Sequence, residues 1–376
     1  MYQELTKLQR EMMEKYRLDA LVTMSPENIT YLTGTSVPTQ ITVRQREVAH
    51  ILTMDCDPEV IIVNIEEPLM RMQGWIPGDK ITAYNEFTQK PMMLTIETLK
   101  RMGVENKRIG FELSYVPATD LFMLQKELPD AEIVNADELY EEMRMVKLPF
   151  ELRRIQEFGA QVEDVIYGVF ANAKAGMTEK ELQNMLVNGF NRIGGDKLNI
   201  PVVASGERSV LLNGAATDRV LKKGDLVRID LIGLKNNYQC DCCRTAVVGD
   251  PDPVHLNIWE KVVCSHDDAI AKIRPGVGSK TIYDSFYNQF IEWGFDPVAF
   301  VGHGLGLSLH EEPYINPYKN TLLRENMVLC VEPIITLDGC RGYQLENEVL
   351  VTGDGHQMIT GTKSKYDYSK LPVIEA

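Results

Sequence analysis

The sequence of 376 residues lacks any apolar stretch that approaches the roughly 20 residues needed to cross a bilayer. Residues 1–16 form a charged amphipathic run and have no apolar centre of the kind found in a signal peptide. Positive charge is also scarce, because 39 Lys and Arg face 54 Asp and Glu, which gives a net charge of −15. Nucleic acids and anionic membranes are bound by Lys/Arg-rich surfaces. We therefore expect no nucleic-acid partner and no membrane partner.

Cysteine is sparse, and its spacing does not suggest a disulfide framework. The chain has 7 cysteines, of which Cys240, Cys242 and Cys243 crowd into one segment. Neighbours in one strand cannot easily bridge each other, and no CxxC pair recurs at the spacing of zinc sites. We interpret these three residues as small buried hydrophobes in a reduced, cytoplasmic protein.

Two parts of the chain differ in their hydrophobic pattern, and the length alone predicts two or three domains. Residues 1–145 alternate short apolar runs with helical periods, which predicts an α/β domain with strands near 20–23, 48–54, 60–63, 108–111 and 131–134. Pro149 is expected to begin a helix, so we place the boundary between 145 and 146. Residues 146–376 read as helix pairs followed by strand pairs, which predicts an α+β domain of two related halves. The helices are expected at 150–173, 178–194, 253–273 and 278–293, and the strands at 226–233, 239–248, 328–336 and 344–352.

Two aspartates lie in apolar strand patterns on either side of a turn. Asp230 stands within Val227–Gly233, where a lone buried carboxylate would cost several kcal/mol. Asn236-Asn237 follows, a pair that tolerates positive φ and suits a tight hairpin. Asp241 lies in the next strand at nearly the same distance from the turn. We therefore expect Asp230 and Asp241 to be opposite or diagonal to each other across one hairpin.

A second strand pair repeats this arrangement with glutamates. Glu332 interrupts an apolar run, Asp338-Gly339 is a strong hairpin signal, and Glu346 follows at a matching distance. Four carboxylates on two hairpins repel one another strongly unless cations lie between them. Two divalent metal ions would balance their combined charge.

His303, flanked by Gly302 and Gly304, is the natural fifth ligand, because glycines let the backbone approach closely. Four carboxylates and one imidazole form a hard, oxygen-rich set that favours Mn, Co, Fe or Zn over Cu. Two such ions, about 3.5–4 Å apart, can share a water, ionise it and polarise a carbonyl or phosphoryl group.

Other interpretations of the same residues are weaker. A single buried Asp or Glu is more often part of an ion pair, but four on two similar hairpins reverse that expectation. The segment Gly302–Gly306 does not have the spacing of GxxxxGK[ST] or GxGxxG phosphate loops. His310-Glu311 lacks the second histidine of an HExxH zinc helix.

In combination, these motifs resemble the creatinase/prolidase family of pita-bread hydrolases. The resemblance covers nearly the whole chain, and it includes Leu18–Gly34 near the start and Met145–Pro149 at the junction. It implies an α/β creatinase-like N-terminal domain and a pseudo-symmetric α+β pita-bread catalytic domain. The matching motifs run in the order Asp230, Asp241-Cys242-Cys243-Arg244-Thr245, Gly302-His303-Gly304, His310-Glu311, Val331-Glu332-Pro333 and Glu346-Asn347.

The resemblance also implies a role for each matching residue. Asp230 would bind one metal ion, Asp241 and Glu346 would bridge both, and His303 and Glu332 would hold the second. Glu332 would double as the general acid/base, and His310 would hydrogen-bond the substrate and stabilise the oxyanion. Members of the family are commonly homodimers, so we expect one here.

Two departures from the family pattern bear on the substrate. Asn213 stands where the peptidases usually have a histidine before the first metal strand, and it cannot shuttle a proton. Gln344 replaces the usual arginine two residues before Glu346, which removes a charged partner for the substrate or for a neighbouring acid. Because all five ligand positions are kept, these changes favour an altered substrate over a lost metal. We count His310, Asn213 and Gln344 as substrate-binding candidates.

Several functions stay open on the sequence alone. The first is a dinuclear-metal hydrolase, an Xaa-Pro dipeptidase or proline-type aminopeptidase, in which a metal-bridged hydroxide attacks the scissile amide of a small peptide. The second keeps the fold and metals but acts on a non-peptide metabolite, by C–N hydrolysis as in creatinase or ectoine hydrolase, or as a lyase. The third is a non-catalytic binding protein. A two-metal nuclease or phosphatase is disfavoured by the net charge of −15.

Overall fold

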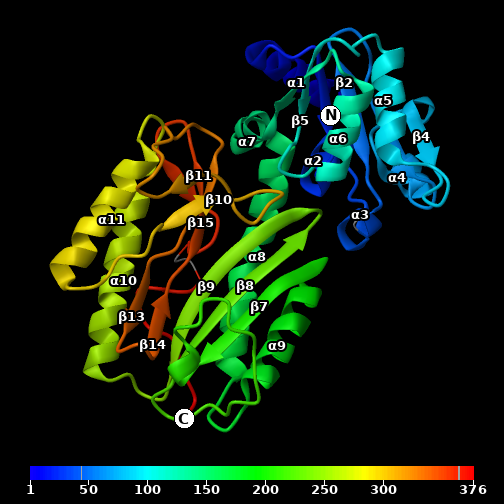
Figure 1. The fold of residues 1–376 in the computed structure, drawn as a ribbon. Helices are drawn as coiled ribbons and strands as arrows, with labels where there is room; N and C mark the ends of the chain where they lie inside the picture. The colour runs from blue at the N-terminus through cyan, green and yellow to red at the C-terminus, as the bar shows by residue number, and fades with distance from the viewer. Residues whose placement is uncertain (44, 363–364) are drawn as a thin grey trace. The chain divides into compact units, whose positions relative to one another are not determined.

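The chain divides into two units, Met1–Arg144 and Met145–Ala376, in a computed structural model that describes residues 1–43, 45–362 and 365–376 (Figure 1). Within these ranges, every helix is too short or too polar to pass through a lipid bilayer.

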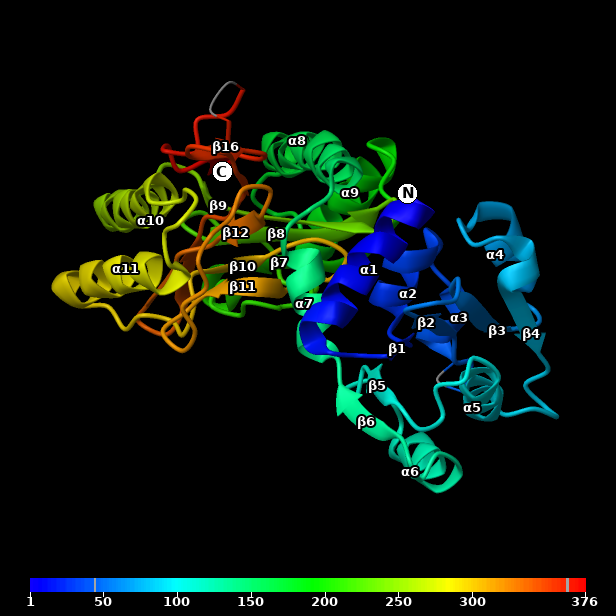
Figure 2. The same cartoon turned by 90° about the horizontal axis from the view of Figure 1, so that it is seen from above.

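The first unit is built around a mixed six-stranded sheet in the order β4-β3-β2-β1-β5-β6 (Figure 2). The strands β1 and β2 run antiparallel, whereas β1, β5 and β6 are parallel to one another. The strands are β1 (Ala20–Thr23), β2 (Ala49–Thr53), β3 (Glu59–Val63), β4 (Ile81–Tyr84), β5 (Arg108–Phe111) and β6 (Glu132–Asn135). The α-helices are α1 (Tyr2–Tyr16), α2 (Pro26–Thr33), α3 (Pro38–Thr42), α4 (Glu67–Gln73), α5 (Pro91–Arg101), α6 (Ala118–Glu127) and α7 (Asp137–Met145).

Helices cover both faces of this sheet. Alternating residues of β3 point to opposite faces, so Ile61 packs in the cluster that includes Ile96 of α5. Ile62, the next residue, packs with Ile29 of α2 and Met70 of α4. Burial on both faces explains why the strand segments are nearly continuous apolar runs. The predicted α/β class of this part of the chain is confirmed.

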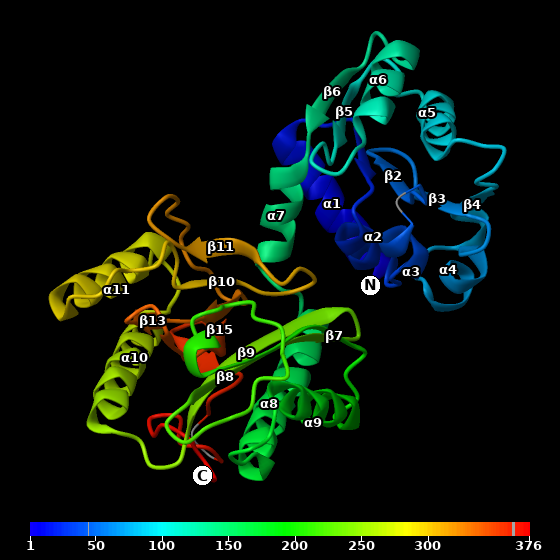
Figure 3. The same ribbon diagram turned by 60° about the horizontal axis from the view of Figure 1, so that its bottom comes forward.

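The second unit contains two main sheets, and each is covered by one pair of helices (Figure 3). One sheet has the order β17-β9-β8-β7, and the other has the order β11-β10-β12-β15-β16. The helices are α8 (Pro149–Asn172), α9 (Glu179–Arg192), α10 (Pro253–Ala271) and α11 (Ser279–Trp293). The strands are β7 (Lys197–Ser205), β8 (Leu226–Lys235), β9 (Tyr238–Val248), β10 (Gly302–Gly304), β11 (Glu311–Ile315), β12 (Val328–Val331), β13 (Ile334–Leu337), β14 (Arg341–Gln344), β15 (Asn347–Val351), β16 (His356–Met358) and β17 (Val373–Ile374).

Each helix pair buries the outer face of its sheet. Val162 of α8 and Leu182 of α9 pack with Ile229 of β8. In the other half, Val262 of α10 and Ile282 of α11 belong to the core cluster of the second sheet. The predicted pairing of helices with strands in two related halves is therefore confirmed. Because the outer faces are covered by helices, the inner faces are left to carry polar side chains.

The turns of both predicted hairpins are present. Asn236 and Asn237 have φ angles of 51° and 70°, and Asp338 and Gly339 have φ angles of 56° and 66°. Two consecutive residues with positive φ match the right-handed twist of the flanking strands. These turns set the register that brings the acidic residues together.

The strand prediction missed β4, β7, β10, β11, β16 and β17, and it included only the last residue of β14. Pro201 lies inside β7, and β10 consists of Gly-His-Gly, so neither shows a strong strand pattern. The second predicted strand pair is also not continuous. It splits into the β12–β15 ladder and a separate β13–β14 ladder, and Pro333, which has no N–H to donate, lies at the break.

Candidate metal centre

The first hairpin places both aspartates on one face of the sheet. Asp230 of β8 pairs with Cys243 of β9, and Ile232 pairs with Asp241, so the two aspartates are diagonal neighbours. Their exposed fractions are 6% and 3%. The expected convergence of Asp230 and Asp241 is therefore observed.

The two glutamates lie at the break in the second ladder. Val331 pairs with Asn347 before the break and Ile334 pairs with Gln344 after it, so Glu332 and Glu346 keep facing positions. At the break, their backbone N–H groups donate hydrogen bonds to segments other than the one they face. Glu332 donates to the carbonyl oxygen of Val301 at 2.9 Å, and Glu346 donates to that of Cys243 at 3.1 Å. The second of these bonds joins the glutamate strand to the strand that carries Asp241.

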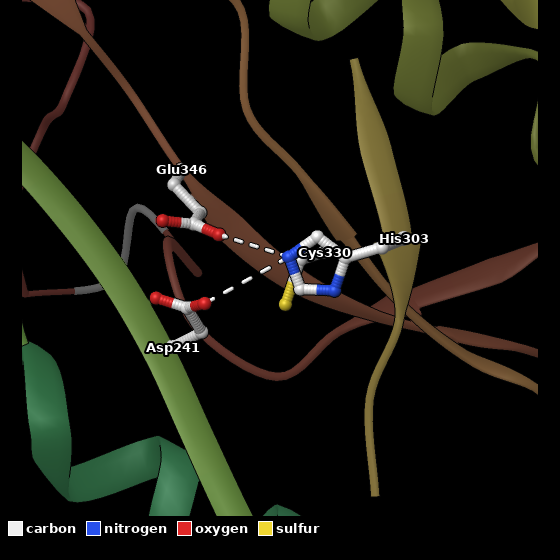
Figure 4. A group of neighbouring side chains, drawn as sticks. All are labelled: Asp241, His303, Cys330 and Glu346. Carbon is white, nitrogen blue, oxygen red and sulfur yellow. Dashed lines mark ion pairs between the residues drawn. The ribbon is translucent and has the colours of Figure 1, made fainter. Parts of the chain in front are cut away.

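His303 lies on β10 with its ring among the carboxylates (Figure 4). Its Nδ1 lies 3.0 Å from the carbonyl oxygen of Gly304, which can only accept, so Nδ1 carries the proton and Nε2 has a free lone pair. Nε2 is 3.4 Å from Glu332 Oε1, 3.8 Å from Asp241 Oδ2 and 3.9 Å from Glu346 Oε1. A metal-binding histidine typically has this arrangement of one anchored and one free nitrogen.

The buried polar atoms of the cluster fit a cation. The atoms Asp230 Oδ1, Asp241 Oδ1, His303 Nε2 and Glu346 Oε1 are all buried, and none has a hydrogen-bond partner among the described residues. Buried polar atoms are nearly always satisfied, so a group of unsatisfied acceptors around one point indicates a missing positive partner. The residues present therefore fit divalent metal ions.

The electrostatics of the cluster agree with this interpretation. Burial raises the pKa of Asp230 to about 6, although the nearby guanidinium of Arg228 opposes the shift. Burial, and then the charge of Asp230, raises the pKa of Asp241 well above its ordinary value. Burial and the charge of Asp241 do the same to the pKa of Glu346. Without a cation, these side chains resist ionisation.

Arg228 brings a guanidinium beside both Asp230 and Gln344. Its Nη1 lies 3.6 Å from Asp230 Oδ2 and donates to Gln344 Oε1 at 2.7 Å. Gln344 Nε2 in turn donates to Glu332 Oε2 at 3.1 Å. Asp230 therefore has a charged partner in Arg228, which the sequence-based prediction did not name. A sequence signal was available, because an arginine two residues before Asp230 lies in the same apolar strand and on the same face.

Arg228 also fixes the loop that precedes Asn213. Its Nε donates to the carbonyl oxygen of Ser209 at 3.1 Å, and its Nη2 donates to that of Leu212 at 2.7 Å and to that of Leu211. Asn213 itself is exposed on this loop. Among the described residues, its side chain makes no hydrogen bond or ion pair with the candidate ligands. Of the three substrate-binding candidates, Gln344 and His310 contact the cluster and Asn213 does not.

His310 stacks on the ligand histidine. The ring centroids of His310 and His303 are 3.8 Å apart, and their planes differ by 15°. Phe300 and Tyr314 each pack near the His310 ring, with ring centroids 5.9 Å from that of His310. Desolvation, and then the proximity of His303, lowers the pKa of His310 to about 4, so its ring is neutral at pH 7 and can donate a hydrogen bond.

Cys330 belongs to the same group of side chains, and the sequence-based prediction missed it. Potential ligand atoms of Asp241, His303, Cys330 and Glu346 all lie within 4.8 Å of one another, and all four residues are buried. The available signal was strand alternation, since Cys330 precedes Glu332 by two residues. Cys240, Cys242 and Cys243 are buried, as expected of small hydrophobes. Glu311 forms a buried ion pair with Lys147 at 2.8 Å.

Comparison with known proteins extends over nearly the whole chain. The model of the creatinase/prolidase N-terminal domain matches residues 5–146, and the model of metallopeptidase family M24 matches residues 153–353. An Xaa-Pro dipeptidase of Pyrococcus horikoshii is 28% identical over 360 residues, which is 94% of this chain and 95% of that protein.

Solved structures show the same fold. The prolidase of Pyrococcus horikoshii has a TM-score of 0.82 and 26% identity, and the match covers 96% of this chain and 99% of that one. The X-Pro aminopeptidase of Thermotoga maritima has a TM-score of 0.84 and 22% identity over 100% and 99% of the two chains, which speaks for the fold alone. The fold is a creatinase-type α/β domain followed by a pseudo-symmetric pita-bread catalytic domain. The chain is thus a metal-dependent hydrolase that belongs to metallopeptidase family M24.

Proposed function

We propose that this chain hydrolyses Xaa-Pro dipeptides or short peptides with a proline after the scissile bond, at a centre of two divalent ions. The observation that carries the proposal is the convergence of five buried potential ligands. Four of them have a buried donor atom that makes no hydrogen bond among the described residues. The likeness to a curated Xaa-Pro dipeptidase over 94% of the chain supports the substrate class.

In this proposal, Asp230 would hold one ion, His303 and Glu332 would hold the other, and Asp241 and Glu346 would be shared between them. The diagonal placement of the aspartates and the facing positions of the glutamates support a shared centre. When bound, the two ions lower the pKa of a water and polarise the substrate carbonyl. The expected metal is one of Mn, Co, Zn and Fe, because the donor set is mainly oxygen with one imidazole.

The protein residues then orient the substrate and move protons. Glu332 serves as the general acid/base that delivers a proton to the leaving nitrogen of the amide. Its carboxylate is well placed for this role because Gln344 Nε2 holds Oε2 at 3.1 Å. His310 is neutral at pH 7, so it donates a hydrogen bond to the oxyanion that develops on the substrate carbonyl.

Further parts of the proposal concern the whole protein. We assign the catalysis to residues 146–376 and an accessory role to residues 1–145. The family resemblance underlies our proposal that the protein is a homodimer. Free cysteines at all seven positions support a reducing, cytoplasmic location.

The decisive experiment combines elemental analysis of the purified protein with a matched panel of Xaa-Pro and non-proline dipeptides. We expect two equivalents of divalent metal per chain and turnover of the proline dipeptides that rises when Mn²⁺ or Co²⁺ is added. Asp241→Ala is the control, since it should lose both metal and activity. Full metal occupancy without turnover of any proline dipeptide would contradict the proposed substrate.

A second candidate keeps the metal centre but acts on a small non-peptide metabolite by C–N hydrolysis. The observation that favours it lies beside Glu332, where Gln344 stands in place of the arginine usual in the family. There, Arg228 donates a hydrogen bond to Gln344. This bond occupies the guanidinium that could otherwise bind a peptide carboxylate. A metabolite screen on metal-loaded protein tests this candidate.

A further inference from the structure

Cys330 faces the candidate metal centre from the middle of its sheet. It pairs directly with His303 across the β10–β12 ladder and with Glu348 across the β12–β15 ladder. Directly opposed residues of antiparallel strands point to the same face, so the thiol and the imidazole lie side by side. The residue is fully buried, and its sulfur is not part of a disulfide.

The donor atoms around Cys330 are close enough to share one ion. Potential ligand atoms of Cys330, His303, Asp241 and Glu346 lie within 4.8 Å of one another (Figure 4). Two ligand atoms bound to one tetrahedral ion at ~2.0–2.3 Å are about 3.3–3.8 Å apart. A contraction of about 1 Å, well within the reach of side-chain rotation, would therefore complete such a site.

Each neighbour of Cys330 in this group has a buried acceptor atom without a hydrogen-bond partner among the described residues. His303 Nε2, Asp241 Oδ1 and Glu346 Oε1 are buried acceptors that make no hydrogen bond among the described residues. These orphaned atoms are a second observation, independent of the cysteine, that points to a cation at the position the thiol faces.

We propose that Cys330 is an additional ligand of the metal centre, whose sulfur makes the site prefer a thiophilic divalent ion such as Zn²⁺ over Mn²⁺. This inference rests on the proposed metal centre and concerns the identity of its metal. In the binding step, the thiol S–H bond breaks, a sulfur–metal bond forms, and the proton passes to solvent. Thiolate is a soft ligand, and its presence in a set of carboxylates and one imidazole shifts selectivity away from hard, oxygen-preferring ions.

The first test uses the unaltered protein, so it does not depend on the folding of a variant. The protein is loaded with Zn²⁺, and X-ray absorption fine structure is recorded at the zinc edge. We expect a sulfur shell at ~2.3 Å in addition to the nitrogen and oxygen shell at ~2.0–2.2 Å. Zinc bound through nitrogen and oxygen alone would overturn the role of Cys330 while leaving the metal centre intact. A protein that binds no divalent ion at all would overturn the proposed centre together with this inference.

The second test compares Cys330→Ser with Cys240→Ser as a matched control. Cys240 is equally buried, but it belongs to the cluster that packs beneath α8 and α9. With Co²⁺ bound, the unaltered protein and Cys240→Ser should show a thiolate-to-cobalt charge-transfer band that Cys330→Ser lacks.

Competitive titration then measures metal preference in the same proteins. Cys330→Ser should lose at least about tenfold in Zn²⁺ affinity, while its Mn²⁺ affinity changes much less. Equal ratios of Zn²⁺ to Mn²⁺ affinity in all three proteins, or a charge-transfer band that survives in Cys330→Ser, would refute the proposal.

Discussion

Arg228 is a fully buried cation that links three parts of the candidate site. It contacts Asp230, which is one of the proposed ligands, and the carbonyl groups of the loop that leads to Asn213. Through Gln344 it also reaches Glu332, the proposed acid/base. Removal of a buried charge partner costs about 3–5 kcal/mol, so direct substitution of Arg228 risks unfolding. Gln344 is the better position at which to interrupt the chain of contacts.

Gln344→Leu should show whether Gln344 orients the carboxylate of Glu332 for catalysis without taking part in metal binding. The change removes the hydrogen bond to Glu332 Oε2 but none of the proposed ligands. We expect kcat to fall about 10–100-fold, as for other partners that orient metal-site residues, with a smaller change in KM and full metal occupancy. Steady-state kinetics on the best dipeptide and elemental analysis check this result.

The control for this substitution is Gln161→Leu on α8. Its amide donates to the carbonyl oxygen of Glu157 within its own helix, and no other contact of this amide is seen among the described residues. It should leave kcat, KM and metal content unchanged. An unchanged kcat in Gln344→Leu would show that Glu332 does not need its amide partner for catalysis.

At the scale of elements, the short strand β10 depends on its two glycines. A Cβ at Gly302 would lie 2.2 Å from the carbonyl oxygen of Cys330, and a Cβ at Gly304 would lie 2.5 Å from that of Glu312. Both clashes are with backbone, so a larger residue must push β10 away from a neighbouring strand. Since β10 carries His303, the displacement would move a proposed ligand.

Gly302→Ala is therefore expected to lower the free energy of unfolding by about 1–3 kcal/mol and to weaken metal binding. Gly168→Ala is the matched control, because Gly168 lies exposed in α8 and has nothing within 4 Å of an added Cβ. It should gain up to about 1 kcal/mol from its better helix propensity and bind metal normally. Denaturant unfolding and metal titration measure both effects. Normal metal binding by Gly302→Ala would show that β10 tolerates the shift.

The elements that could be predicted from sequence are those with a strong local signal. Asn236-Asn237 and Asp338-Gly339 define tight turns, and the register that follows from them brought Asp230 near Asp241 and Glu332 near Glu346. By contrast, β10 contains two glycines around His303 and has no hydrophobic alternation. Its pairing with β11 and β12 is a tertiary effect that no local pattern reports.

At single positions, the proposed ligands stood out because a carboxylate in an apolar strand demands a partner. Cys330 did not stand out, because a buried cysteine is an ordinary small hydrophobe until its neighbours are known. Arg228 was overlooked although a buried arginine demands a partner just as strongly. Its contacts with Asp230 and Gln344 depend on the tertiary packing of two strands that are far apart in the sequence.

At the scale of the whole catalytic unit, each of the two halves contributes a pair of buried carboxylates to the same site. Each half buries its outer sheet face under a helix pair and directs carboxylates inward. The backbone bond from Glu346 to Cys243 joins the halves at the point of greatest repulsion. The guanidinium of Arg228 and the imidazole of His303 lie beside these carboxylates. The metal-free unit is therefore under electrostatic strain, and the strain depends on pH.

The sign of this dependence follows from the raised pKa values. Burial raises the pKa of Asp230 to about 6, and those of Asp241 and Glu346 well above the ordinary range. The folded, metal-free protein thus holds protons that the unfolded chain has released, and it loses stability as pH rises through these values. For Asp230 alone the loss corresponds to ~3 kcal/mol between about pH 4 and pH 7, given ~1.4 kcal/mol for each pH unit.

Divalent metal should remove this penalty, because bound ions stabilise the ionised carboxylates. The difference in melting temperature between metal-loaded and chelator-treated protein should therefore be larger at pH 8 than at pH 6. Differential scanning calorimetry at both pH values measures it, and the comparison of loaded with metal-free protein cancels the titration of groups elsewhere in the chain. In the double variant Asp241→Asn, Glu346→Gln, which lacks two of the titrating groups, the metal-dependent difference should largely vanish. A stabilisation by metal that is equal at the two pH values would mean that these carboxylates are already ionised in the metal-free fold, and that the protein itself neutralises them.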